Sequence, residues 1–389
     1  MVDEKLVPKL RFAGFNDNWQ KTTLNDIATF SKGKGISKND ISEEGIECVR
    51  YGELYTKYGE LIYNIDSKTN LNKNELILSN KNDILIPCSG ETAIDLATAS
   101  CIQKEQVAIG GDITIIQTNQ YAPFITYYLN QKRNEIARFA QGVSIVHLYS
   151  KDFKALKMKI PSINEQKKII SLLEVLTKKE QLLEQKYRNY QEFKKYLMQQ
   201  IFAQKLRFDF KGEWESRFID EIFDITRGDV IAKTLIKETP NNEYCYPVFS
   251  SQTTNKGIMG YYNDFDFDGE FITWTTDGAN AGKTVYRNGK FKCSNVCGVL
   301  KAKMEYDGFA NQFIAEYLDS ITHRYVSYVG NPKLMNNVMA KIKIKYPPLD
   351  EQVKISALFN KVDFSIDLIE KQLVSVQEFK KGLLQQMFI

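Results

Sequence analysis

Few residues in this sequence combine the type and the spacing that catalysis requires. The segment GANAGKT at 278–284 is close to a phosphate-binding loop, but such a loop needs four residues between its glycines, and Gly278 and Gly282 enclose three. The residues that follow, VYRNGKF, predict a strand and a turn, whereas a phosphate site would need the N-terminus of a helix. We interpret the segment as a glycine-rich turn that brings the backbone close to a partner.

Other short motifs also fall short of a catalytic site. NPKL at 331–334 lacks the second proline and the aromatic residue of the Asn-Pro-Pro-aromatic motif of amino-methyltransferases. Two Glu-Gln-Lys triplets, at 165–167 and 184–186, have the form of half a nuclease motif, but they lie in predicted helices, where charged residues are ordinarily solvated. The two histidines cannot complete a zinc site with Cys293 and Cys297, which are four positions apart. The sequence therefore predicts no catalytic residue and no metal site.

The composition is that of a globular chain. Of the 389 residues, 43% are hydrophobic and 26% are charged, with 22 glycines and 9 prolines. No run approaches the roughly 18 uncharged apolar residues of a membrane-spanning helix, and the first residues lack the apolar core of a signal peptide. The six cysteines are irregularly spaced, which favours reduced thiols that act as small core residues. We expect a cytoplasmic protein of two or three domains.

Two stretches, 20–159 and 214–345, supply polar and basic groups suited to a nucleic acid. Lysine and arginine suit phosphates, and glutamine, asparagine, serine and arginine suit base edges in the major groove of DNA. The net charge is only +4, so groups that bind DNA must converge in space. The candidate DNA-binding residues are Lys32, Lys34, Lys38, Arg50, Tyr51, Arg227, Lys233, Ser250, Ser251, Gln252, Asn255, Lys256, Asn280 and Lys283.

An internal repeat organises the elements that position these groups. The tetrapeptide KLRF occurs at 9–12 and again at 205–208, and the segment 161–202 matches 347–388 at 17 of 42 positions. A match of this length does not arise by chance, and repeats of this size indicate duplicated structural units. The chain therefore consists of two copies of a variable block followed by a similar one.

The similar blocks predict two long helices, over 160–204 and 346–389. Apolar residues recur in them at seven-residue spacing, which is typical of a coiled coil. Asn164 and Asp350 are placed to cap the first turns. The predicted seam between the helices consists of Ile169, Leu176, Leu183, Tyr190, Leu197, Ile355, Val362, Ile369, Val376 and Leu383.

The two helices are expected to pack antiparallel on each other. An antiparallel pair gives a duplicated chain approximate twofold symmetry, with the variable blocks at opposite ends of the pair. We expect Ile355, Val362 and Ile369 to pack against Leu176 and Leu183. Glu180 and Lys194 are polar positions in the first seam, so that helix is also expected to offer a face to another protein.

The variable blocks predict mixed α/β domains with many short strands. Runs of Thr, Ile, Val and Phe, such as 112–118, 270–276 and 297–303, alternate with glycine and asparagine. Each block closes with a strand that leads into a proline, at 154–161 and 340–347. The predicted fold is mixed α/β, with two β-rich recognition domains separated by two long antiparallel coiled-coil helices, as an internal tandem repeat in a pseudo-twofold arrangement. The expected parts are an N-terminal recognition domain over 1–159, a central spacer helix over 160–204, a C-terminal recognition domain over 205–345 and a distal spacer helix over 346–389.

Together these features resemble the DNA specificity (S) subunits of type I restriction–modification systems. The resemblance rests on the KLRF-containing start at 9–15, on Pro-x-x-x-Glu-Gln at 161–166 and 347–352, and on the segment 249–291, and it covers essentially the whole chain. It implies that the two variable blocks are target recognition domains. It also implies that the two helices form the spacer coiled coil that docks modification subunits.

The resemblance further implies partners and cofactors. The chain would read a bipartite, asymmetric target in double-stranded DNA and dock two modification (methyltransferase) subunits together with restriction/translocase subunits. S-adenosylmethionine, ATP and magnesium would belong to those partner subunits, and this chain would hold no cofactor, contact no membrane and catalyse no reaction. The alternative is a non-catalytic coiled-coil scaffold or adaptor with two protein- or glycan-binding lobes. Steep loss of DNA affinity with salt distinguishes a DNA-binding protein from such an adaptor.

Overall fold

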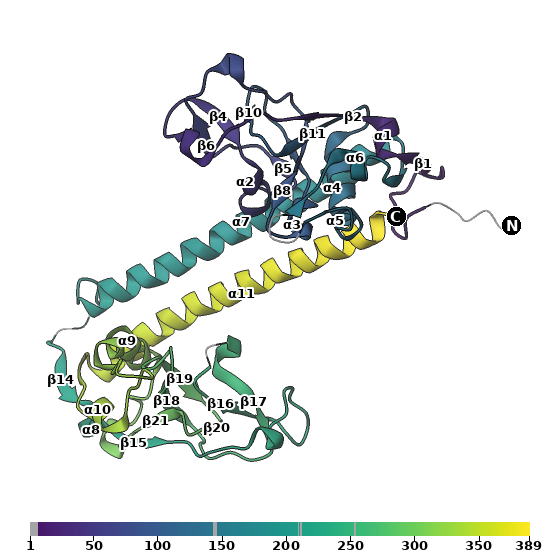
Figure 1. Cartoon of the computed structure of the whole chain (residues 1–389). Coiled ribbons are helices and arrows are strands. Elements are labelled where there is room, and N and C mark those ends of the chain that lie inside the picture. Colours follow the sequence, from purple (N-terminus) through teal and green to yellow (C-terminus); the bar gives the residue numbers. More distant parts are fainter. Residues whose placement is uncertain (1–6, 143–145, 209, 211, 253) are drawn as a thin grey trace. The chain divides into compact units, whose positions relative to one another are not determined.

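The protein forms two compact units (Figure 1). The computed structural model describes residues 7–142, 146–208, 210, 212–252 and 254–389, so Thr253 of the segment 249–291 lies outside the described residues. The first unit comprises residues 1–182 with 372–389, and the second comprises residues 183–371. Within the described ranges, no helix is long and apolar enough to cross a membrane.

The first unit is built on a five-stranded sheet in the order β2-β11-β7-β9-β5 and also contains a four-stranded sheet in the order β10-β4-β6-β3. Its main core gathers Trp19, Phe124 and Tyr128 with the start of the first long helix. The strands are β1 (Gln20–Thr23), β2 (Ala28–Lys32), β3 (Ile41–Ser42), β4 (Ile46–Val49), β5 (Leu61–Ile62), β6 (Ser67–Thr69), β7 (Ile84–Pro87), β8 (Ser89–Gly90), β9 (Ser100–Ile102), β10 (Ala108–Ile109), β11 (Ile113–Thr118), β12 (Val146–His147) and β13 (Lys157–Ile160). The short helices are α1 (Leu24–Ile27), α2 (Tyr51–Thr56), α3 (Ala93–Leu96), α4 (Ala122–Gln131), α5 (Arg133–Ala137) and α6 (Ser150–Phe153).

The second unit has a four-stranded sheet in the order β15-β21-β18-β19 and a three-stranded sheet in the order β17-β16-β20. Trp214, Trp274 and Phe313 are buried in its main core. Five of the six cysteines are buried, as expected, but Cys245 is exposed, so the prediction that all six act as core residues is wrong for Cys245. The strands are β14 (Glu215–Phe218), β15 (Phe223–Arg227), β16 (Tyr246–Phe249), β17 (Ile258–Tyr262), β18 (Glu270–Thr275), β19 (Thr284–Asn288), β20 (Lys292–Cys293), β21 (Cys297–Ala302) and β22 (Lys343–Tyr346), and the short helices are α8 (Ile219–Ile222), α9 (Gln312–Thr322) and α10 (Asn336–Ala340).

The two units share a strand-pairing pattern, which gives residues of the matched strands in one unit a counterpart in the other. The antiparallel strands β2, β11 and β7 correspond to β15, β21 and β18. The parallel pair β4-β10 corresponds to β16-β20, and the pair β1-β13 corresponds to β14-β22. The strands predicted to lead into the two prolines are β13 and β22, which confirms this part of the sequence analysis.

The predicted long helices are α7 (Ile163–Phe202) and α11 (Leu349–Met387). They contact each other and run antiparallel: in the first unit Gln377 bonds Glu180, and in the second Lys194 pairs with Asp363 (Figure 1). The predicted seam residues are buried except Leu183 and Tyr190, which are half-buried.

Two details of the predicted helices are wrong. The expected partners of Ile355 and Val362 were Leu176 and Leu183, but within the second unit Ile355 and Val362 pack in one core with Leu197, and within the first unit Leu176 packs in one core with Leu383. Both helices carry equal heptads, so the pattern allows several antiparallel registers and does not choose among them. The caps of both helices are also displaced: Ser162 accepts a hydrogen bond from the Glu165 amide while Asn164 already lies inside α7, and Asp350 lies inside α11, which begins at Leu349.

Candidate nucleic-acid interface

The candidate residues gather at matching strand ends in the two units. Lys32 ends β2 and Arg227 ends β15. Each is followed by a glycine, and backbone from another segment lies too close to that glycine to leave room for a side chain. A Cβ on Gly33 would lie 2.0 Å from the Gly110 carbonyl oxygen, and one on Gly228 would lie 1.9 Å from that of Cys293. Only glycine therefore allows the two backbone segments to approach so closely at this point.

The second pair of strand ends lies next to these glycines. Arg50 and Tyr51 follow β4, and Ser250 and Ser251 follow β16, the corresponding strand of the second unit. The strand that pairs in parallel with β4 is β10, and its last residue, Ile109, lies against Gly33. In the second unit β16 pairs in parallel with β20, which contains the Cys293 that lies against Gly228. In each unit, the predicted residues that follow the two strands therefore lie close together. The fold thus brings together residues that are about 20 positions apart in the sequence.

In the first unit this edge is basic and aromatic. The Lys32 ammonium lies 5.4 Å from the centre of the Tyr149 ring, and Lys151 lies 5.6 Å from the same ring. Arg50 is less available, because it starts α2 and its guanidinium lies 3.5 Å from the buried carboxylate of Glu53. Burial would raise the pKa of Glu53, but hydrogen bonds from Ser67, the Arg50 amide and Lys57 lower it below its ordinary value. Lys34, Lys38 and Tyr51 are exposed.

In the second unit, part of the predicted set lines a cavity of about 390 Å³. Four predicted residues border this cavity: Ser250, Gln252, Lys256 and Lys283. The other predicted residues of this unit, which are Arg227, Lys233, Ser251, Asn255 and Asn280, lie outside the set that borders it.

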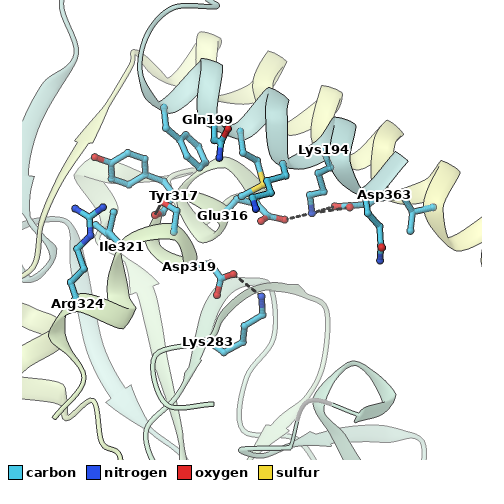
Figure 2. Close-up of a pocket in the computed structure, with 15 residues that line it drawn as sticks. Lys194, Gln199, Lys283, Glu316, Tyr317, Asp319, Ile321, Arg324 and Asp363 are labelled. Carbon is cyan, nitrogen blue, oxygen red and sulfur yellow. Dashed lines mark hydrogen bonds and ion pairs between the residues drawn. The ribbon is translucent and has the colours of Figure 1, made fainter. Parts of the chain in front are cut away.

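Both lysines at this cavity already have acidic partners. Lys256 pairs with Asp367 at 2.6 Å, and Lys283 pairs with Asp319 at 2.6 Å. Figure 2 shows the Lys283 pair at the border of a larger groove of about 860 Å³ that α7, α9 and α11 line. These contacts compensate the lysine charges before any nucleic acid binds.

The same groove contains the partners of Lys194, one of the two polar positions in the predicted seam. Lys194 of α7 lies between Glu316 of α9 and Asp363 of α11, at 2.6 and 2.8 Å (Figure 2). Burial opposes the charge of Lys194, but the two carboxylates outweigh burial and raise its pKa. Lys194 and Glu180 thus both bond across the helix pair.

Arg287 is the charged residue of this cavity that the sequence analysis missed. It lies on β19, with its guanidinium carbon 3.6 Å from the centre of the Phe249 ring. Among the described residues it has no acidic partner. Burial lowers the pKa of Arg287 to about 10, which still leaves it charged at neutral pH. Its signal in the sequence is weak, since a single arginine in a five-residue strand is not part of any motif.

GANAGKT at 278–284 and NPKL at 331–334, the two motifs that were close to catalytic sequences, contact each other. Gly278 donates to the Pro332 carbonyl, and Leu334 accepts the buried indole N–H of Trp274. The residues after GANAGK form β19, which confirms the predicted strand and not a phosphate-binding helix. Three or more His, Cys, Asp or Glu side chains that could hold a metal ion do not gather anywhere in the described part of the chain.

The repeated Glu-Gln pairs tie each long helix to its unit. Glu165 accepts two hydrogen bonds from Arg11 at 2.7 and 2.8 Å, and Glu351 accepts two from Arg207 at 3.1 and 2.7 Å. The adjacent glutamines donate to the carbonyls of the prolines five residues earlier. All four Glu and Gln side chains are buried. The KLRF and Pro-x-x-x-Glu-Gln motifs of the sequence are therefore two sides of one contact.

The sequence matches the family described as type I restriction modification DNA specificity domain over residues 16–189 and 211–378. A putative type I specificity subunit of Mycoplasma pneumoniae is 35% identical over 241 residues, which cover 61% of this chain and 87% of the relative. The specificity subunit of the type I restriction enzyme MpnII from the same organism is 37% identical over 198 residues, or 50% of this chain and 58% of the relative.

The crystal structure of a type I restriction–modification S subunit from M. genitalium has the same fold. It superimposes with a TM-score of 0.69 over 98% of this chain and 99% of that chain, at 19% identity. The family match extends over both variable blocks and into both long helices. The chain therefore belongs to the type I restriction–modification DNA specificity family.

Proposed function

We propose that this chain reads a bipartite, asymmetric DNA target, with one half-site for each unit. The observation that carries the proposal is that both units place basic and polar residues at the same strand ends with different side chains. Where the first unit has Arg50 and Tyr51, the second has Ser250 and Ser251. One scaffold with two different sets of contacts suits two different half-sites on one duplex.

The long helices are proposed to dock two copies of a modification subunit. The pentapeptide QEFKK occurs at 191–195 and 377–381, and its phenylalanine is exposed in both copies, 48% for Phe193 and 57% for Phe379. Exposed aromatic residues are common anchors of protein interfaces. Two identical exposed motifs on α7 and α11 support two binding sites for the same partner.

Catalysis is proposed to belong to partner subunits. The candidate interface consists of basic, amide and hydroxyl groups, which bind DNA but supply no methyl donor and no nuclease centre. We propose that modification subunits use S-adenosylmethionine, and that restriction/translocase subunits use ATP and magnesium. The chain supplies target recognition to both.

The test compares the purified chain with the complex it forms with its modification subunits. The chain alone should neither methylate nor cleave DNA, and the complex should methylate it. Affinity of the complex for target DNA should fall steeply between 50 and 200 mM salt, by roughly 10³-fold or more if about six phosphates are contacted. Methylation by the chain alone would contradict the proposal. DNA affinity that does not change with salt concentration would also contradict it, and would favour a protein or glycan adaptor.

A further inference from the structure

Arg287 lies where the first unit has a purely apolar core. In β18 and β19, Phe271 pairs with Arg287, and Thr273 pairs with Val285. The register of β7 and β9 makes Ile102 the counterpart of Arg287 and Leu85 the counterpart of Thr273. Ile102 and Leu85 are fully buried in one cluster with Val49, the counterpart of Phe249. The fold itself therefore does not require an arginine at this position.

The apolar pair of the first unit is replaced by a polar pair in the second. Arg287 Nε lies 3.3 Å from Thr273 Oγ1, and Arg287 Nη2 donates to the Lys256 carbonyl at 3.0 Å. Stacking on Phe249 fixes the plane of the guanidinium. An arginine has five N–H donors, and these contacts use two of them. Arg287 lines the cavity, and no hydrogen bond from its remaining donors is formed within the described part of the chain.

The loop that holds Arg287 adopts an unusual backbone. Asn255 and Lys256 have φ values of 50° and 53°, in the left-handed region that residues other than glycine seldom adopt. Asn255 and Lys256 directly precede Gly257, and in this conformation the Lys256 carbonyl accepts the hydrogen bond from Arg287. Strained residues of this kind concentrate at binding sites, where the surrounding structure holds them in place.

We infer that Arg287 is a specificity-determining residue that donates two hydrogen bonds to the major-groove edge of a guanine in the half-site read by the second unit. The inference rests on the proposed function. A fork of donors without an acidic partner needs two adjacent acceptors, and guanine alone among the bases offers two in the major groove, O6 and N7. A phosphate also offers two acceptors to a guanidinium, but Arg287 is held in one plane on Phe249 and is partly desolvated, which suits a base edge in a fixed position.

Two variants test the inference in the complete complex. Arg287→Lys keeps the charge but loses the planar fork, and the double variant Arg287→Ile with Thr273→Leu installs the apolar pair of the first unit. Arg324→Gln removes an exposed arginine outside this cavity and serves as the control. The methylated motif is determined by methylome sequencing, and binding is measured with duplexes in which each G·C pair of the half-site is replaced in turn.

Both variants should lose discrimination at one guanine of one half-site, by roughly 5- to 150-fold, and should keep the other half-site unchanged. An unchanged motif, with affinity lowered equally for all sequences and a weaker salt dependence, would identify a phosphate contact and overturn the inference. Wild-type motif and affinity in both variants would overturn it too. Failure of the wild-type complex to bind DNA is a separate result that contradicts the proposed function itself.

Discussion

Glu165 and Glu351 fix the start of each long helix by binding an arginine from a segment far away in the sequence. Their side chains are almost fully buried, while the guanidinium groups of Arg11 and Arg207 are partly exposed. A buried carboxylate needs such a partner, because leaving water costs several kcal/mol per ion. The hydrogen bonds that Arg207 donates to Glu351 also raise the pKa of Arg207. Substituting these glutamates should therefore loosen the helix from its unit.

Glu351→Gln should lower the free energy of unfolding by about 1–3 kcal/mol, because the neutral amide keeps only part of the hydrogen bonding to Arg207. Glu370→Gln is the matched control on the same helix, since Glu370 is exposed, and it should change stability by less than about 0.5 kcal/mol. Equilibrium urea unfolding measures both. Equal effects of the two substitutions would show that the buried pair does not hold the helix.

At the scale of elements, α7 and α11 each carry an exposed QEFKK phenylalanine that the helix pairing leaves free. Phe193→Ser and Phe379→Ser should each reduce the modification subunits bound per chain from two to one, and the double variant should bind none at micromolar concentration. Each substitution removes an aromatic anchor, which costs on the order of 2 kcal/mol or more at an interface centre. Light scattering of the purified complex gives the stoichiometry. Val230→Ser, at an exposed position outside the repeat, is the control, and two subunits bound to the double variant would place the docking surface elsewhere.

The elements were largely predictable from the sequence, and the cavity was not. Heptads and the internal repeat predict both long helices, because periodicity is local information. Arg287 and Phe249 are 38 positions apart and lie on strands of two different sheets, β19 and β16, so composition does not reveal their contact. The register of the helices was also beyond reach, because equal heptads fit several alignments equally well. Candidate residues at Lys256 and Lys283 were chosen for their charge, and their acidic partners come from distant segments.

At the scale of the whole molecule, the two long helices are expected to set the spacing between half-sites. Seven residues inserted at matched positions in both helices lengthen the pair by about 10 Å at 1.5 Å per residue, equivalent to about three base pairs of B-DNA. The spacer of the methylated motif should lengthen accordingly, or binding should fail because the units lose angular register on the duplex. Full affinity for the original spacer would return the helices to a purely structural role.

The central claim is that each unit reads its own half-site, and exchanging one variable block tests it most directly. Residues 214–345 are replaced by the corresponding block of another member of the family, while the KLRF and Glu-Gln contacts stay intact. Methylome sequencing of cells that carry this chain with its modification subunits should show a motif in which one half-site is new and the other is unchanged. A motif in which both half-sites change, or in which neither does, would contradict independent reading by the two units.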